Sequence, residues 1–528
     1  MLLTRVSYRK CPVPSTPSER DRARGVRAAF VIVAVALLPA MLVASKDFGA
    51  TWDEPQQRAK GQHLFAYLTG ASPVLIDPID GAHLYGAPLD LACAALERVL
   101  TIDPYVLRHL VIAGTGWLGL VLCGILANQL FGPPHGLLAL VLLAVSPVYM
   151  AHAMNNPKDI PFATAATALL LALTRVGNSK PFLSWRLVLV LALIIGASLN
   201  VRPGGLLFVG YLAVLVLFRI LSAGPLPLST LAAIELRLAA VVVGAVAIGW
   251  VAWPWAYANP LVAPFRALAE LGHFGWGGTI LFDGRTYAGT SLPRSYVPQW
   301  FWLVLSPVVL VGLALSLLRL REAEIRGQVI AMWGAMVFPI VYVIGTHATL
   351  YDGIRHLLFV LPPAIVLASA GWIGAGRAAL PMARPVVFVA VFIGVAEPAW
   401  FQWRNYPNQG AYIQPLAGGP RAAYAQYDLD YWGNSMLQAL SHLDRQAGRG
   451  PVFVSGWPLI VLQADLSRFP RMVLTEPGDP RAAHFVRLAR GTRGELLRLD
   501  KSKDLELRVT TADGALLCAV AATDPLRH

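Results

Sequence analysis

Residues 28–55 read AAFVIVAVALLPAMLVASKDFGATWDEP, an apolar run followed closely by two acidic residues, Asp53 and Glu54. A helix needs about 20 predominantly apolar residues to cross a bilayer core, and the run at 28–44 approaches that length. A signal peptide cleaved near Ser45 is the alternative interpretation. We interpret the run as an uncleaved anchor, because a long basic tail precedes it and the acidic pair follows directly.

The composition extends this interpretation to the whole chain. Of 528 residues, 56% are hydrophobic and only 14% are charged, whereas soluble domains carry about 25% charged residues. We place eleven apolar runs, at residues 28–45, 106–130, 136–153, 160–174, 186–200, 204–222, 237–256, 299–318, 328–346, 357–375 and 385–401. The sequence therefore predicts a polytopic α-helical membrane protein with about eleven transmembrane helices.

The basic residues predict the orientation of these spans. The net charge is +13, and Lys and Arg concentrate in the cytoplasmic loops of membrane proteins. If the tail at 1–27 is cytoplasmic, the basic gaps share its side; they hold Arg175, Lys180, Arg186, Arg219, Arg237, Arg319, Arg321, Arg326, Arg377 and Arg384. We expect a multi-pass protein of the cell (inner) membrane, and a nucleic-acid partner is not expected.

The end of the chain is predicted to form a separate domain outside the membrane. Residues 403–528 are more polar, and their strand-like runs at 452–454, 471–474 and 515–520 are too short to span a bilayer. This pattern favours an α/β extracytoplasmic domain. The expected order is a cytoplasmic tail (1–27), a transmembrane module (28–402, with outer loops 46–105 and 257–298) and the extracytoplasmic domain (403–528).

The four cysteines show no metal-binding spacing. Cys11 lies in the basic tail, and Cys123 is expected inside a span. Cys93 and Cys518 are both expected on the outer side. A disulfide between these two is therefore open as an alternative to two free thiols.

The acidic pair after the first span has two interpretations. Thr51 and Glu54 have the spacing of a capping box, so the acids can simply start a helix. In the functional interpretation, Asp53 is a general base fixed in position by that same helix start. The two interpretations are compatible.

A second polar cluster lies between the third and fourth runs, where Lys158 and Asp159 are flanked by prolines. A polar turn with a snorkelling lysine is the simple interpretation. The functional one has Lys158 contacting a phosphate and Asp159 orienting it or contacting sugar. Further cations are predicted on the outer face, where Lys and Arg are usually fewer: Arg202, Arg285, Arg294 and Arg355. Anion binding would explain them, because the guanidinium fork matches phosphate geometry.

The third cluster, residues 351–356 (YDGIRH), places Asp352 and His356 four residues apart. In a helix they would share one face, as a metal pair or as a local ion pair or hydrogen bond; a third metal ligand at suitable spacing is lacking. The outer loop 257–298 adds aromatic residues, including Trp276, that suit either a sugar site or anchoring at the membrane interface.

Together these clusters resemble the GT-C membrane glycosyltransferases, in particular glycosyltransferase family 39, which contains protein O-mannosyltransferases and lipid A aminoarabinose transferases. The pair Asp53-Glu54 resembles the family's catalytic acidic motif. Residues 156–162 (NPKDIPF) resemble the loop after its third span, and 351–356 resemble a motif of bacterial members. The resemblance covers about 28–402, and residues 427–433 (YDLDYWG) resemble an outer domain of some bacterial members.

The resemblance implies transfer of a sugar from a polyprenyl-phosphate-linked donor to an acceptor hydroxyl on the outer face, with inversion of the anomeric centre. The acceptor is a lipid, a glycan or a protein. The implied catalytic residues are Asp53, Glu54 and Asp159; the donor-phosphate ligands are Lys158, Arg355, Arg202 and Arg285; the sugar or acceptor ligands are Tyr351, Asp352, His356 and Trp276. No cofactor is required, and a divalent metal is left open.

Three further classes of protein fit parts of the pattern. A secondary transporter would place polar residues near the bilayer midplane and often shows internal repeats, but here the polar clusters lie in loops. The remaining two classes are a lipid-linked-glycan translocator and a non-catalytic membrane scaffold with an outer binding domain.

Overall fold

The computed structural model describes residues 17–75, 81–177, 180–448 and 450–526, so Cys11 lies outside the described residues. Each predicted apolar run forms a helix or a bent pair of helices. They are α1 (Pro17–Ala44), α4 (Pro104–Phe131), α5 (Pro133–Ala144) with α6 (Pro147–Asn155), α7 (Asp159–Leu173), α8 (Trp185–Val201), α9 (Leu206–Ser222), α10 (Leu228–Gly249), α12 (Tyr296–Val304) with α13 (Pro307–Leu318), α14 (Arg326–Gly345), α15 (Leu361–Ala378) and α16 (Arg384–Arg404).

The helices that correspond to the eleven predicted runs differ in length and straightness. Among the described residues, seven helices are long and apolar enough to cross a membrane, or up to nine if each bent pair is one span. The pairs bend by 68° and 112° where Pro147 and Pro307 begin a new helix, because proline cannot continue the preceding hydrogen-bond ladder. With 15 and 17 residues, α7 and α8 reach only about 23–26 Å. The chain is a multi-pass membrane protein.

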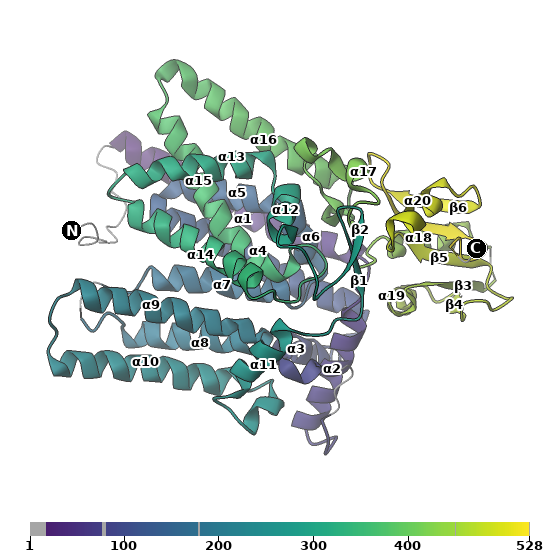
Figure 1. Cartoon of the computed structure of the whole chain (residues 1–528), viewed down its shortest axis with the longest axis horizontal. Coiled ribbons are helices and arrows are strands. Elements are labelled where there is room, and N and C mark those ends of the chain that lie inside the picture. Colours follow the sequence, from purple (N-terminus) through teal and green to yellow (C-terminus); the bar gives the residue numbers. More distant parts are fainter. Residues whose placement is uncertain (1–16, 76–80, 178–179, 449, 527–528) are drawn as a thin grey trace.

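The helices form two groups with separate hydrophobic cores (Figure 1). One core joins α7, α8, α9 and α10, and glycines allow close contact within it: a Cβ on Gly196 of α8 would lie 2.7 Å from the carbonyl oxygen of Ala245. The other core joins α1, α4, α5, α6 and α12 to α15, with α7 contributing to both. Small residues at helix contacts are typical of membrane bundles.

Shorter elements gather at one end of the bundle (Figure 1). They come from the two long loops: α2 (Glu54–Leu68), α3 (Pro88–Leu96), α11 (Ala263–Gly272) and an antiparallel hairpin of β1 (Thr279–Phe282) and β2 (Arg285–Ala288). The C-terminal domain lies at the same end. We call this end of the bundle, with α2, α3, α11 and the C-terminal domain, the loop face.

The C-terminal domain is α/β, as predicted. Its five-stranded sheet has the order β4-β3-β5-β7-β6, in which β3 pairs in parallel with β4 and β5 while β7 pairs antiparallel with β5 and β6. The strands are β3 (Val452–Trp457), β4 (Met472–Leu474), β5 (His484–Leu488), β6 (Leu505–Thr510) and β7 (Leu516–Ala521); the helices include α17 (Gly419–Ala423), α18 (Met436–Gln446), α19 (Leu459–Asp465) and α20 (Arg493–Lys501). All six residues of β7 are buried, which fits its place inside the sheet.

This domain is joined to the segment before α2 by hydrogen bonds. The backbone N–H of Ala50 donates to Oδ1 of Asp465 (2.7 Å), and the N–H of Gly49 donates to Oδ1 of Asn434 (3.0 Å). The core of the second helix group also continues into the domain, where it includes Leu496 and Leu516. The domain therefore sits firmly against the residues that precede Asp53.

Cys93, Cys123 and Cys518 are free, buried thiols, so the disulfide between Cys93 and Cys518 that the sequence left open does not form.

Asp465 should make this contact sensitive to pH. Burial raises the pKa of Asp465 to about 7, against an ordinary value of 3.8, with help from the nearby Glu54 carboxylate. The folded state thus holds a proton that the unfolded state has lost between about pH 4 and pH 7, and the stability due to this group falls as the pH rises through that window. We predict that the unfolding temperature of the wild type falls from pH 5 to pH 7.5 more steeply than that of Asp465→Asn. Equal slopes in thermal denaturation would contradict this.

Candidate active site

A cavity of about 1930 Å³ extends from the loop face to the space between α9 and α14. At the loop face its described lining is polar and includes Asp53, Lys158, Arg202, Asp352, Arg355, His356 and Arg490. From there it continues between α9 and α14 as an apolar channel, the α9–α14 groove, lined by residues such as Leu207, Val214, Ile330, Ala331 and Phe338. The groove ends near Arg219 in the last turn of α9 and Gln328 in the first turn of α14, at the ends of these helices that lie away from the loop face. Charged and apolar ligand parts could therefore bind in one continuous space.

Asp53 lies in the polar part of the cavity, at the residue just before α2. Pro55 is the second residue of this helix and suits its first turn. Oδ2 of Asp53 accepts a hydrogen bond from Nη1 of Arg355 (2.9 Å). Burial alone would raise the pKa of Asp53, but the charges of Arg355, Lys158 and Arg202 outweigh it and hold the pKa below its usual value. The carboxylate is therefore ionised and ready to accept a proton, although its ion pair with Arg355 weakens it as a base.

Glu54 points away from the cavity. Its side chain is fully buried, accepts a hydrogen bond from the backbone N–H of Thr51 (2.8 Å) and lies 3.1 Å from Nε2 of His109. Glu54 supplies its half of the expected capping box, whereas the Thr51 hydroxyl has no hydrogen-bond partner in the described part of the chain. The geometry gives Glu54 a positioning role at the start of α2 and no contact with a ligand in the cavity.

Lys158 and Asp159 are fixed by the side chain of Asn156. Its Oδ1 accepts from the backbone N–H groups of Lys158 (3.1 Å) and Asp159 (2.8 Å), which closes the turn before α7. Nζ of Lys158 reaches the cavity and donates to the hydroxyl of Tyr85 (2.8 Å). Burial would lower the pKa of Lys158, but the Tyr85 hydroxyl and the Asp53 carboxylate outweigh it and raise the pKa above its ordinary value. Lys158 is therefore a cation.

Asp159 contacts residues of the site but does not itself line the cavity. Its carboxylate accepts from Nδ2 of Asn156 (2.8 Å) and forms an ion pair with Arg202. Arg202 lines the cavity, whereas Asp159 is buried outside the lining. The structure thus pairs two residues that the sequence analysis had assigned to the site separately, but only the arginine faces the space that a ligand would occupy.

Residues 351–356 form a tight turn, which differs from the helical arrangement that we considered for Asp352 and His356. Asp352 (φ 58°) and Gly353 (φ 67°) are both left-handed, and helical structure begins only at Arg355. The hydroxyl of Tyr296 accepts from the N–H of Gly353 (3.1 Å) and stabilises the turn. Asp352 is paired with arginines instead of His356. Among the described residues, no group of three His, Cys, Asp or Glu side chains is arranged to hold a metal ion.

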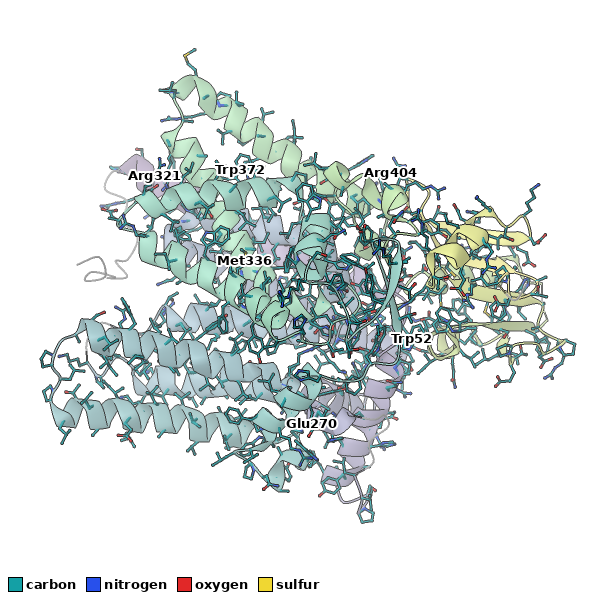
Figure 2. The ribbon with its side chains drawn as sticks, in the orientation of Figure 1. Trp52, Glu270, Arg321, Met336, Trp372 and Arg404 are labelled. Carbon is teal, nitrogen blue, oxygen red and sulfur yellow. The ribbon has the colours of Figure 1, made fainter. Side chains whose placement is uncertain are left out.

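Aromatic rings form one wall of the polar part. Tyr351 stacks on Trp276 with 4.5 Å between ring centroids and 2° between planes, and His356 lies edge-on to Tyr351 at 4.7 Å. Trp52, next to Asp53, lies where the start of α2 meets the C-terminal domain (Figure 2). All four side chains line the cavity. Such flat apolar faces beside charged groups suit a sugar ring.

The C-terminal domain supplies residues that the sequence analysis missed. Nη2 of Arg490 donates to Oδ1 of Asp352 (2.9 Å), and Nε1 of Trp432 donates to Oδ2 of the same carboxylate (3.2 Å). The hydroxyl of Tyr431 lies 2.8 Å from Nε2 of His152. The resemblance at 427–433 marked the segment that holds Trp432 and Tyr431. The sequence around Arg490, after β5, carries no comparable signal.

One predicted phosphate ligand lies elsewhere. Arg285 is on the exposed side of β2 and outside the cavity lining, so the structure does not bring it together with Lys158, Arg202 and Arg355. Arg294 is also outside the lining, beside the ring of His347 (3.4 Å).

Solved structures share this architecture over nearly the whole chain. ArnT from Cupriavidus metallidurans in the apo state is 14% identical, with a TM-score of 0.52 over 96% of this chain and 99% of that chain. The structure of ArnT bound to undecaprenyl phosphate gives a TM-score of 0.51 at 14% identity, over 94% and 98% of the two chains. ArnT is a glycosyltransferase of the GT-C class.

The chain has the GT-C fold. The predicted GT-C architecture is thereby confirmed. A weaker likeness is to the Archaeoglobus fulgidus oligosaccharyltransferase, at 12% identity with a TM-score of 0.46 over 87% of this chain and 64% of that chain. No protein-family model matches the sequence, and no curated protein matches it.

Proposed function

We propose that this GT-C protein transfers a sugar from a polyprenyl-phosphate-linked donor to an acceptor hydroxyl, with inversion at the anomeric carbon. The observation that carries the proposal is the shape of the cavity. A cluster of cations around Asp53 opens directly into the apolar α9–α14 groove. This arrangement fits a ligand with a phosphate at one end of a long hydrocarbon chain.

In this proposal the donor phosphate binds between Lys158, Arg202 and Arg355. All three side chains line the polar part of the cavity, and the aliphatic tail extends into the α9–α14 groove. Undecaprenyl phosphate is the ligand in the structure of ArnT from Cupriavidus metallidurans, which is consistent with a donor of this class here. The Tyr351–Trp276 stack is in position to contact the sugar, with His356 beside it.

Asp53 acts as the general base. It accepts the proton of the acceptor hydroxyl while that oxygen attacks the anomeric carbon and the bond to the donor phosphate breaks. The polyprenyl phosphate leaves with the electron pair, and the cations stabilise its charge as it develops. Before the donor binds, Arg355 is paired with Asp53. A donor phosphate competes for Arg355, so the carboxylate recovers basicity when the donor is in place.

The remaining predicted residues support this arrangement. Both oxygens of Asp352 are occupied by Arg490 and Trp432, so we assign it to the charge network behind Arg355 and not to contacting the acceptor. Glu54 and Asp159 likewise act through their neighbours. The acceptor is placed beside Trp52, which lines the cavity next to Asp53 together with Trp457 and Arg490 of the C-terminal domain.

The loop face is proposed to lie outside the cytoplasm, in the cell (inner) membrane. The basic tail and the basic gaps between spans support this orientation. A reporter that is active only in the cytoplasm, fused after His528, is predicted to be silent, and one fused into the gap near Lys180 is predicted to be active. The opposite pattern would place the site on the cytoplasmic face and remove the need for a lipid-linked donor.

Transfer can be tested with the purified protein in proteoliposomes that contain a radiolabelled polyprenyl-phosphate sugar and a crude envelope acceptor fraction. The proposal predicts that the label moves covalently from the lipid to acceptor material. Because the α9–α14 groove runs along both helices, a lipid-linked-glycan translocator is the second function that this assay must separate. Label that crosses the bilayer while still attached to its lipid, without any transfer, would favour the translocator and contradict the glycosyltransferase.

A further inference from the structure

Arg490 is the first member of a chain of alternating charges that runs from the C-terminal domain to Asp53. It pairs with Asp352 (2.9 Å), Asp352 lies 3.4 Å from Nε of Arg355, and Arg355 pairs with Asp53 (2.9 Å). Arg355 is 3% exposed and Asp352 is 5% exposed. Charges that are this strongly buried depend on their partners, since water cannot replace them.

Arg490 is itself held by the domain. Its Nη1 donates to the carbonyl oxygen of Tyr431 (2.6 Å), and its guanidinium lies 5.7 Å from the ring centroids of both Trp52 and Trp276. The adjacent Trp432 sits in a turn closed by Asp430, whose carboxylate accepts three backbone N–H groups of the following residues. The domain therefore offers Asp352 two fixed donors, one of them charged.

The charges around the site show what Arg490 contributes. Lys158, Arg202, Arg355 and Arg490 lie among Asp53, Asp159 and Asp352, and Arg490 also interacts with the buried carboxylate of Asp428. Arg490 therefore balances a carboxylate that would otherwise compete with a phosphate for Arg355. Without Arg490 this balance is lost. Asp352 would also lose its charged partner and draw Arg355 toward itself.

We propose that Arg490 is a positioning residue for the donor phosphate: it occupies Asp352, which keeps Arg355 directed at the cavity. This inference rests on the proposed function and assigns a role to the C-terminal domain, which completes the donor site in addition to covering it. Arg490 acts through Asp352 and does not itself contact the phosphate.

The test is binding of undecaprenyl phosphate to the purified full-length protein in detergent, with no transfer step involved. R490Q is expected to weaken binding by about tenfold or more, the effect of losing one charged hydrogen bond. The double variant R490Q/D352N also removes the carboxylate that would draw Arg355 away from the cavity, and it is expected to bind within about threefold of the wild type. R481Q is the matched control, because Arg481 is an exposed arginine of the same domain that pairs only with Asp479 among the ion pairs of the described chain; it should bind as the wild type does.

Rescue by the second substitution separates positioning from general damage to the domain. If folded R490Q binds as tightly as the wild type, or if R490Q/D352N is as weak as R490Q, the inference is wrong. Should R490Q fail to fold, D352N is the deciding variant, because it removes the carboxylate that competes for Arg355. Affinity at or above that of the wild type then supports the inference, and a tenfold loss overturns it. If the wild type binds no undecaprenyl phosphate, the proposed function fails first, and this inference fails with it.

Discussion

Asp53→Asn is expected to lower the turnover of the reconstituted protein by about 10²-fold or more, the contribution of one positioned general base. The substitution keeps the shape of the side chain and removes its ability to take a proton. Folding should survive, because Asp53 lies in the cavity wall and Arg355 retains Asp352 as a partner. Turnover is measured with the labelled donor in proteoliposomes at matched protein abundance.

Glu54→Gln is the matched comparison, because the same change is made at the adjacent residue. The amide oxygen can still accept from the Thr51 N–H, so the main cost is the weakened contact with His109. We expect a loss of stability on the order of 1 kcal/mol, as for a helix cap, and a much smaller loss of turnover than for Asp53→Asn. Near-normal turnover by Asp53→Asn would show that the base lies elsewhere.

Arg355→Ala is expected to have the second largest effect, by raising the KM for the donor about tenfold to 10²-fold. Arg355 is the cation nearest to Asp53, and removing it takes away a guanidinium that matches phosphate geometry. Lys158→Ala should act in the same direction, but more weakly if Lys158 contributes a single point charge. The measurement is initial rate against donor concentration, at fixed acceptor, for each variant.

Arg285→Ala serves as the control for these two variants. Its sequence context predicted a phosphate ligand, yet the residue is exposed on β2 and outside the cavity lining. The donor KM of Arg285→Ala should equal that of the wild type. Unchanged donor dependence in Arg355→Ala and Lys158→Ala, or a large change in Arg285→Ala alone, would reject the proposed phosphate site.

The helices and the polar clusters could be predicted because their signals are local. Apolar runs identify the membrane helices directly, and the order of Asp53, Lys158 and Arg355 along the chain suggested one site, which the structure brings together in one cavity. The bends at Pro147 and Pro307 could not be predicted in the same way, because the apolar pattern of a run does not show whether its helix is straight or broken. Because of these bends, and because α7 and α8 are short, seven to nine of the eleven predicted runs are long enough to be full-length spans in the described part of the chain.

The details of the site depended on contacts between distant parts of the chain. Spacing suggested a shared helix face for Asp352 and His356, but the left-handed turn at Asp352 directs its carboxylate to Arg490, 138 residues later in the chain. The sequence likewise predicted the same phosphate-binding role for Arg285 and Arg202, although only Arg202 lies beside Asp159. Such partners are set by the tertiary fold, and no spacing rule within one segment reveals them.

A polyprenyl phosphate is proposed to bind with its phosphate among the cations next to Asp53 and its tail in the α9–α14 groove. A cryo-electron microscopy map of the protein with bound undecaprenyl phosphate would show both positions. We expect phosphate density in contact with Lys158 and Arg355, with continuous tail density between α9 and α14. Phosphate density outside this cavity, in a map that resolves the side chain of Asp53, would contradict it.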